Sequence, residues 1–497
     1  MVSIDLGAQS GRVALGRFDG ETLTVTELHR FPNVAVRAAG TLHWDALRLH
    51  DGLLEGLRLA AREAGGSIDS VAVDTWGIDF ALLDRAGRLV GNPVHYRDDR
   101  TQGAMERLFA RIPKRELYAR TGIQLMPINS IFQLAAMVDI DDPSLAAASS
   151  FLMMADLFHY WLSGVQVSEF TNATTSQLYD PVAGGWANDL LERLGVPSTI
   201  FPEIVQPGTV LGPLLPEVAD ETQIGSAVVV ATATHDTAAA VASIPFEEPG
   251  SAYISSGTWS LIGVEVDAPV IDERSFAANL TNEGGVAGTL LLRNVTGLWM
   301  LHECRTAWAR AGADVGYDDL VARAEQVPPL RSIIDTDDPA FLAPGDMPGR
   351  IRDHCARIGE QSPVDQAAVA RCVLESLALK YRQTIELLEA VTGSRPPAIH
   401  VVGGGALNHL LCQWTADATG LPVVAGPVEA AEIGNLAVQV LAIGELASIE
   451  EARELVCRSF TTQTYEPRAR EPWDEAYIRL EQAKFEGSEL LVNPKCE

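Results

Sequence analysis

The sequence predicts an α/β protein built from two similar halves. Short runs of β-branched residues alternate with segments of helical periodicity through most of the 497 residues, a pattern typical of strands and helices packed in layers. Each half begins with a strand, a turn of small polar residues and a second strand. Between the halves, segment 244–250 contains two prolines and lacks periodicity, so we place a domain boundary there.

The first half is expected to open with a β-hairpin and to continue with helices between single strands. The helix over 45–64 ends at Gly65 and Gly66, a common signal for a helix stop. The expected strands are 2–4, 13–18, 23–29, 71–74, 80–83 and 228–233, and the expected helices are 45–64, 130–138, 151–163, 188–194 and 237–243.

The second half repeats this opening, which indicates a duplicated α/β domain with a cleft between the copies. The expected strands are 252–255, 259–264, 289–293 and 399–402, and the expected helices are 297–310, 364–391, 407–418 and 431–443. We therefore expect an N-terminal domain over 1–243, a C-terminal domain over 244–450 and a tail over 451–497 that packs on them.

The charge balance excludes some classes of partner. The chain has 37 Lys and Arg against 66 Asp and Glu, a formal net charge of −29. Such a charge repels nucleic-acid backbones and anionic membrane surfaces, so neither is expected as a partner. A small anion such as ATP is still possible, because backbone N–H groups and a metal ion reverse the field locally.

Cysteine usage and the N-terminus point to the cytoplasm. The six cysteines, Cys304, Cys355, Cys372, Cys412, Cys457 and Cys496, contain no CxxC pair, so we expect reduced thiols, although Cys355 and Cys372 could pair across a loop. The N-terminus lacks the pattern of a signal peptide, and no run of 18 apolar residues predicts a membrane helix. The oligomeric state is not predicted.

Two turns are candidates for binding phosphate. In DLGAQSGR (5–12), Gly7 and Gly11 allow backbone N–H groups to approach a phosphate. Arg12 could add a charged hydrogen bond, and Asp5 could hold Mg²⁺ through water. The turn SSGTWS (255–260) stands at the matching place of the second half. Either turn alone is better explained as an ordinary β-hairpin, but together they could clamp a nucleoside triphosphate.

Two further segments lie where a strand meets a helix. The triple glycine 403–405 leaves room for a flat ligand such as adenine, or for close packing of helix on strand. Asp236 in THDT (234–237) follows a predicted strand, where ligands of open α/β sheets gather. Its carboxylate could accept a proton from a substrate hydroxyl attacking a γ-phosphate, or it could be a helix N-cap.

Segment DTWGID (74–79) could line a sugar pocket. Gly77 leaves space beside Trp76, whose ring could stack on a sugar or could simply be buried in the core. His235 and Asn294 are possible partners for sugar hydroxyls.

These motifs, in this order, resemble the FGGY carbohydrate kinases, a family related to actin and the heat-shock chaperone ATPases. The resemblance extends over roughly residues 1–445 and is carried by collinear motifs: DLGAQSGR, DTWGIDFALLD, VHYRDDRT, EFTNATTSQL, THDTAAAV, SSGTWSL, NLTNEGG, LRNVTGLW, HVVGGGALN and AGPVEAAEIGN. It implies two ribonuclease-H-like domains with a catalytic cleft between them. It also implies transfer of the γ-phosphate of MgATP to the 1-hydroxyl of L-rhamnulose, giving L-rhamnulose 1-phosphate and ADP.

The resemblance also implies roles for individual residues. Asp236 would be the general base, and Asp5 would lie at the metal. The sugar would contact Gly77, His235, Asp236, Thr237 and Asn294. The nucleotide would contact Ala8, Gln9, Ser10, Gly11, Arg12, Thr258, His302 and Gly403. His302 departs from the family pattern, because it stands where a glutamine is expected near ATP.

Two alternatives remain open at the level of sequence. One is a kinase of the same family for another ketose or polyol, such as L-fuculose, D-xylulose or an autoinducer. The other is a non-enzymatic ATP switch on the same fold.

Overall fold

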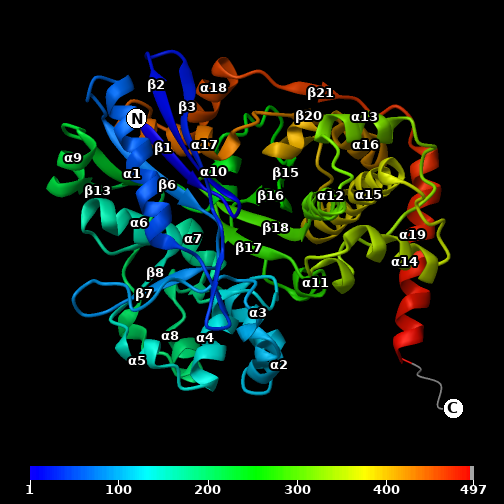
Figure 1. Ribbon diagram of the computed structural model, residues 1–497, viewed down its shortest axis with the longest axis horizontal. Helices are drawn as coiled ribbons and strands as arrows, with labels where there is room; N and C mark the ends of the chain where they lie inside the picture. Colours follow the sequence, from blue (N-terminus) through cyan, green and yellow to red (C-terminus); the bar gives the residue numbers. More distant parts are fainter. Residues whose placement is uncertain (493–497) are drawn as a thin grey trace. The chain divides into compact units, whose positions relative to one another are not determined.

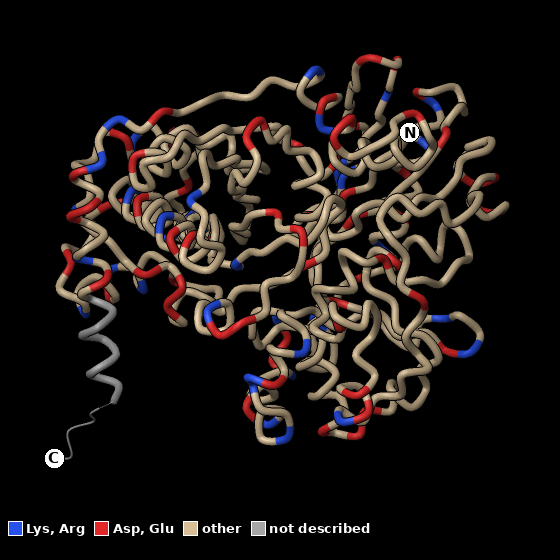
Figure 2. The backbone as a smooth tube through the Cα atoms, turned by 180° about the vertical axis from the view of Figure 1, so that it is seen from behind, with Lys and Arg blue, Asp and Glu red and all other residues tan. Residues whose placement is uncertain are grey.

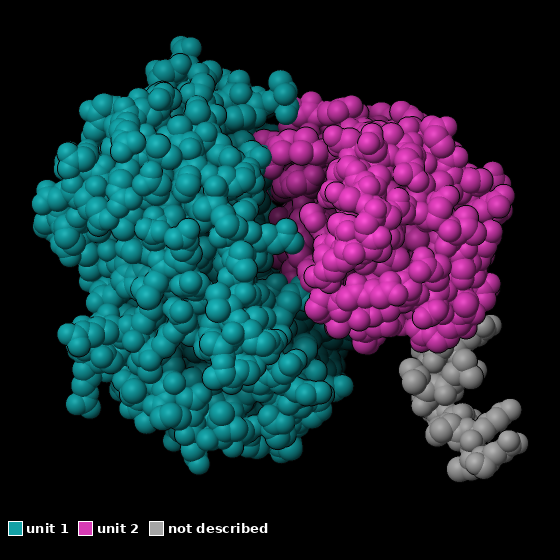
Figure 3. Space-filling view, viewed as in Figure 1, with its two compact units in different colours: residues 1–245, 265–292, 429–461 teal, residues 246–264, 293–428, 462–497 magenta. Residues whose placement is uncertain are grey.

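The chain divides into two compact units (Figure 3). The structure is a computed structural model that describes residues 1–492. Unit 1 comprises residues 1–245, 265–292 and 429–461, and unit 2 comprises residues 246–264, 293–428 and 462–497. Two segments from the second half of the sequence thus belong to unit 1. The division into 1–243, 244–450 and 451–497 stays a prediction, since contact units and sequence domains are defined differently.

The core of unit 1 is a six-stranded mixed sheet (Figure 1). Strand β1 pairs parallel to β6 and antiparallel to β2, and β6 pairs parallel to β14. In sheet order the strands are β13 (Thr209–Pro213), β14 (Val228–Ala231), β6 (Ser70–Thr75), β1 (Val2–Leu6), β2 (Ser10–Phe18) and β3 (Leu23–Pro32). The predicted opening hairpin is confirmed.

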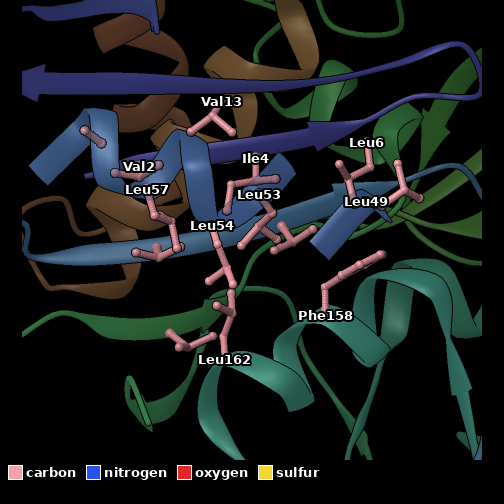
Figure 4. Close-up of a cluster of buried hydrophobic side chains, with 14 of the residues drawn as sticks. Val2, Ile4, Leu6, Val13, Leu49, Leu53, Leu54, Leu57, Phe158 and Leu162 are labelled. Atoms are coloured by element: carbon pink, nitrogen blue, oxygen red, sulfur yellow. The ribbon is translucent and has the colours of Figure 1, made fainter. Parts of the chain in front are cut away.

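Helices cover both faces of this sheet, and β1 and β6 are therefore buried along their whole length. On one face, α1 (Ala46–Glu63) and α6 (Met154–Ser163) pack their apolar sides on the strands (Figure 4). Leu49, Leu53 and Leu57 recur every four residues along α1 and contact the strand side chains. On the other face lie α10 (Asp236–Ala242) and α17 (Ala430–Ala442).

The remaining elements of unit 1 are short. Its other helices are α2 (Ala104–Phe109), α3 (Lys114–Thr121), α4 (Ser130–Asp139), α5 (Pro143–Ala147), α7 (Phe170–Thr175), α8 (Asn188–Leu194), α9 (Pro216–Thr222), α11 (Glu273–Ala277) and α18 (Ile449–Ser459). Its small strand pairs are β4 (Val36–Ala38) with β5 (Thr41–His43), β7 (Phe80–Leu83) with β8 (Ser150–Met153), β9 (Ser168–Glu169) with β12 (Ile204–Val205), and β10 (Tyr179–Asp180) with β11 (Gly185–Trp186).

A second mixed sheet repeats the strand pattern of the first. Strand β15 pairs antiparallel to β16 and parallel to β19, and β19 pairs parallel to β20. In sheet order the strands are β17 (Thr281–Gly284), β18 (Thr289–Thr296), β16 (Trp259–Val266), β15 (Ala252–Ser256), β19 (Ile399–Val402), β20 (Val423–Ala425) and β21 (Gln463–Tyr465). The sequence β18-β16-β15-β19-β20 matches β3-β2-β1-β6-β14, so the predicted duplication is present in the topology.

The helices of unit 2 include the two longest that the structure describes, α15 (Gln366–Thr392) and α19 (Glu471–Val492). The others are α12 (Trp299–Arg310), α13 (Tyr317–Glu325), α14 (Met347–Arg357) and α16 (His409–Thr419). Five cysteines, including Cys355 and Cys372, carry free thiols, as expected, while Cys496 lies outside the described residues.

Three predicted elements differ from the structure. Residues 151–153, expected in a helix, belong to strand β8, which pairs antiparallel with β7. Leu407, expected to begin a helix, is the last residue of a short 3₁₀ turn over Gly404–Leu407, and α16 begins at His409. Asn294, expected just after a strand, lies inside β18, because pairing extends that strand to Thr296.

Charged residues are distributed over the whole chain (Figure 2). Acidic positions outnumber basic ones by 66 to 37 and are scattered through both units. Among the helices that the structure describes, none combines the length and the apolar content that crossing a bilayer requires.

Candidate active site

The carboxyl ends of the central strands of unit 1 bring two aspartates together. Asp5 on β1 stands in register with Asp74 on β6 and with Arg12 on β2. Alternate residues of a strand face opposite sides of the sheet, so Asp5 and Asp74 share the face that α17 covers. Asn435 of α17 donates a hydrogen bond to Asp74 Oδ2 at 2.6 Å.

Arg12 is surrounded by carboxylates. Its guanidinium lies 3.4 Å from Asp5 Oδ2 and 3.6 Å from Glu432 Oε1, and it also bonds Glu429. The sequence predicts Arg12 at a phosphate; in the structure its ion pairs are with these acidic side chains.

This acidic cluster has more carboxyl groups than the one guanidinium of Arg12 can pair. Burial raises the pKa of Asp5 to about 6 and that of Glu432 to about 8, with Arg12 opposing both shifts. Burial also raises the pKa of Asp74 well above its usual range. Asp74 Oδ1 and Glu432 Oε1 are buried without a hydrogen-bond partner. Such hard oxygen donors suit Mg²⁺, although no group of three potential ligands among the described residues has the arrangement of a metal site.

Asp236 lies at the start of α10, just beyond strand β14. It is the first residue of the helix, and His235 is the N-cap, so the alternative that Asp236 is itself the N-cap is wrong. Its side chain keeps a solvent-facing side (35% exposed) and accepts a hydrogen bond from Thr237 Oγ1 at 3.3 Å. Burial of the surrounding segment raises the pKa of Asp236 to about 6, mainly by desolvation, and the bonds from Thr237 oppose the shift.

His235 connects Asp236 to a second carboxylate. His235 Nε2 lies 3.4 Å from Asp236 Oδ1, and His235 Nδ1 lies 3.3 Å from Glu283 Oε2. Burial lowers the pKa of His235, with Glu283 opposing the shift. The imidazole is therefore neutral near pH 7 and lies between the two carboxylates.

Gly77 and Trp76 are held by packing within unit 1. A Cβ on Gly77 would lie 2.9 Å from Thr175 Oγ1, so glycine is required for this close approach. Trp76 is 6% exposed, and its ring centroid lies 4.1 Å from that of Trp44. Its indole N–H donates to the buried Asp79 at 3.0 Å. Trp76 is therefore a core residue, the second of the two sequence-based interpretations.

Backbone hydrogen bonds within the turn and from Asn33 hold the first phosphate-turn candidate, residues 5–12. Gly7 N donates to Ser10 O at 3.0 Å, and Asn33 N donates to Gln9 O at 3.0 Å. Gln9 is exposed at the tip, and Ala8 is half-buried. Gly11 is fixed by packing, since a Cβ there would lie 2.3 Å from the Phe31 ring.

In unit 2, the matching turn is held by the start of α12. Gly297 N and Trp299 N both donate to Thr258 O at 3.2 Å, and Leu298 N donates to Gly257 O at 2.9 Å. Gly297 permits this contact, because a Cβ there would lie 2.6 Å from the backbone of Trp259. The turn that carries Thr258 is thus fixed by three backbone hydrogen bonds.

The triple-glycine loop packs on the same hairpin. Gly403 has φ +76°, a conformation that favours glycine, and a Cβ there would lie 3.0 Å from Ser256 O. Gly404 has open space around it. His302 is half-buried on α12, where burial lowers the pKa of its imidazole.

The structure brings Asp5 and Arg12 together, and it joins His235, Asp236 and Thr237 at one helix start. Five contributors were not predicted as site residues: Asp74, Glu283, Glu429, Glu432 and Asn435. The sequence signal that could have found them is their position in the motifs DTWGIDFALLD, NLTNEGG and AGPVEAAEIGN.

Solved structures identify the class of fold. A ligand-bound xylulose kinase from Lactobacillus acidophilus is 16% identical, with a TM-score of 0.80 over 99% of this chain and 98% of that one. Glycerol kinase from Plasmodium falciparum with ADP is 13% identical, with a TM-score of 0.76 over 98% and 97%. The fold is that of a two-domain α/β sugar kinase, which confirms the predicted fold class.

Sequence comparison is more specific. Residues 1–243 match the N-terminal domain, and residues 252–443 the C-terminal domain, of the FGGY family of carbohydrate kinases. A rhamnulokinase from Bacteroides thetaiotaomicron is 43% identical over 96% of this chain and 98% of its own. One from Pectobacterium carotovorum is 41% identical over 94% and 93%. The chain belongs to the FGGY family of carbohydrate kinases.

Proposed function

We propose that this chain is an ATP-dependent kinase that phosphorylates the 1-hydroxyl of L-rhamnulose, giving L-rhamnulose 1-phosphate and ADP. The names of the relatives at 40–43% identity over nearly the whole chain support this substrate. The observation that carries the chemistry is Asp236, which lies at a strand end beside a neutral, buried His235 and has a pKa of about 6.

Asp236 is suited to act as the general base. A base is most effective when its pKa lies near the working pH, because it is then mostly ionised yet still accepts a proton. With a pKa of about 6, Asp236 is ionised at pH 7 and can take the proton of the attacking sugar hydroxyl. His235 and Thr237 flank it and would orient neighbouring hydroxyls, with Gly77 and Asn294 completing the sugar contacts.

The nucleotide would be held by backbone turns. In this proposal residues 8–12, Thr258 and Gly403 contact the phosphates and adenosine, and His302 stands near the nucleotide in place of a glutamine. Phosphoryl transfer asks the protein mainly for positioning and charge neutralisation, which such turns provide.

Mg²⁺ would enter with ATP as part of the substrate. The unfilled buried acceptors at Asp74 and Glu432, and the excess of carboxylate over Arg12, make the end of β1 suitable for a hydrated cation. Asp5 would hold it through water. When bound, Mg²⁺ supplies neutralisation of the phosphate charge.

The test is ADP release with MgATP and a panel of L-rhamnulose, L-fuculose, D-xylulose and glycerol. The proposal expects release that depends on sugar and is fastest with L-rhamnulose. A preference for another sugar would keep the mechanism and replace the substrate. Release at the same rate without sugar would contradict a kinase and favour the ATP-switch alternative.

A further inference from the structure

The motif EFTNATTSQL contains a carboxylate that the proposed chemistry does not use. Glu169 ends β9 and is the N-cap of α7, and its side chain is fully buried (0% exposed). A buried carboxylate is costly unless hydrogen bonds compensate for lost water. Its hydrogen-bond partners therefore indicate what it does.

Five donors converge on Glu169. Oε1 accepts from Thr171 N at 2.9 Å. Oε2 accepts from Thr171 Oγ1 at 2.6 Å and from Asn172 N at 3.3 Å, which are contacts of a helix cap. Oε2 also accepts from Thr234 N at 3.0 Å and from Thr234 Oγ1 at 2.6 Å. The carboxylate thus joins α7 to a segment 65 residues further along the chain.

Thr234 is two residues before the proposed base. Its carbonyl accepts from Thr75 N at 2.8 Å and from Asn172 Nδ2 at 3.3 Å. The next backbone N–H, that of His235, donates to Thr171 Oγ1 at 3.1 Å. The polar groups of Thr234 and the N–H of His235 are therefore all bonded within unit 1, and Glu169 accepts two of those bonds itself.

We propose that Glu169 is a positioning residue for the base: it holds Thr234, and through Thr234 it sets the position of His235 and Asp236. The inference rests on the proposed function of Asp236. A helix cap alone needs only the bonds to Thr171 and Asn172, whereas the two bonds to Thr234 act on the segment that carries the base.

Two conservative variants separate these roles. Glu169→Asp keeps the charge and a good N-cap residue, but its side chain is one methylene too short to reach Thr234. Glu169→Gln loses the charge but keeps the length, and its amide oxygen can stay at the four donors around Oε2. If Glu169 acts through Thr234, the shorter side chain is the more damaging one.

The experiment measures kcat, the KM values for ATP and sugar, and melting temperature for the full-length variants. A displacement of about 1 Å at a reacting group lowers the rate by roughly 10²-fold. We expect Glu169→Asp to lower kcat by about 10–10², with the KM for ATP within about twofold of wild type and Glu169→Gln intermediate in kcat. Asp180→Asn is the control for loss of a buried carboxylate in unit 1, because Asp180 accepts from Val182 N and Ala183 N and pairs with Arg120 at 2.5 Å, and none of these bonds involves Thr234.

Amide hydrogen exchange gives a readout that does not depend on the substrate. Peptides covering 229–241 should exchange faster in Glu169→Asp than in wild type, and those of Asp180→Asn should not. A wild-type kcat in Glu169→Asp, or unchanged exchange in this segment, would overturn the inference. A loss of kcat equal in all three variants and parallel to their melting temperatures would also overturn it. If the wild type phosphorylates no sugar, the proposed function fails, and exchange still tests the link to Thr234.

Discussion

Replacing Gly434 by alanine should push helix α10 away from helix α17. The two helices of unit 1 touch at Gly434, where a Cβ atom would lie 1.8 Å from Ala239 O and 3.3 Å from Ser243 N. Ala239 is on the same helix as Asp236, three residues further on. The substitution therefore acts on the proposed base from a residue outside the substrate contacts.

The size of the effect follows from the overlap. Cβ atoms essentially never approach another heavy atom closer than 3.0 Å, so α10 and α17 must separate by about 1.2 Å. Overpacking of this kind costs about 1–3 kcal/mol, which corresponds to a fall in melting temperature of about 1–5 °C in a unit of roughly 300 residues. Because Asp236 moves with its helix, kcat should fall by roughly 10²-fold.

The assay combines thermal unfolding with steady-state ADP release at saturating ATP and sugar. Gly91→Ala is the matched control, because Gly91 has an ordinary φ and open space around it; it should match the wild type in both measurements. A Gly434→Ala variant with wild-type melting temperature and wild-type kcat would refute the inference that close packing of α17 on α10 positions Asp236.

Three further predictions concern the base, the core and the nucleotide loop. Since Asp236 must be ionised to accept a proton and has a pKa of about 6, kcat should rise with pH to a plateau with a midpoint near 6; a midpoint near 4, or no acidic limb, would contradict this. Asp79→Leu should cost about 3 kcal/mol or more in the free energy of unfolding at pH 5, because Trp44, Trp76 and Tyr96 lose the acceptor of their N–H groups. Burial raises the pKa of Asp79 from 3.8 to about 6, so wild-type stability falls as pH rises from about 4 through 6. Urea titrations at pH 8 should therefore find this difference smaller than at pH 5 by about 1.4 kcal/mol. Gly403→Ala should raise the KM for ATP several-fold and leave the KM for sugar unchanged, because the φ of +76° at Gly403 and its contact with Ser256 O resist a side chain. Gly404→Ala is the control. Equal KM values for ATP in the two variants would argue against an adenosine contact at Gly403.

Local patterns were sufficient to predict the central strands of the two large sheets, but not the strands β13, β17, β20 and β21. The hairpin β1–β2 and the strand β19 with its glycine loop follow from β-branched runs bounded by glycine. Phe151–Met153 was misassigned because a short apolar run next to a helix has no periodicity that separates strand from helix. Pairing with β7 decides its conformation, and no local pattern predicts that pairing.

The site could be predicted only in part. Asp236 was singled out by its place after the predicted strand 228–233 and by the resemblance to the FGGY kinases, and its role as the base stays a prediction. Glu432 and Glu169 were not singled out, since each acts through a partner far along the chain: Arg12 for Glu432 and Thr234 for Glu169. The membership of 265–292 and 429–461 in unit 1 escaped prediction for the same reason. Contacts of this kind depend on the complete fold.

The most direct test of the proposed mechanism is turnover of L-rhamnulose by Asp236→Asn. The amide keeps the shape of the side chain but cannot accept the proton of the sugar hydroxyl. Removal of a general base predicts a fall in kcat of about 10²–10⁴, with nucleotide affinity unchanged in a direct binding titration. Near-wild-type turnover by this variant, with the nucleotide bound normally, would contradict the assignment of Asp236 as the base.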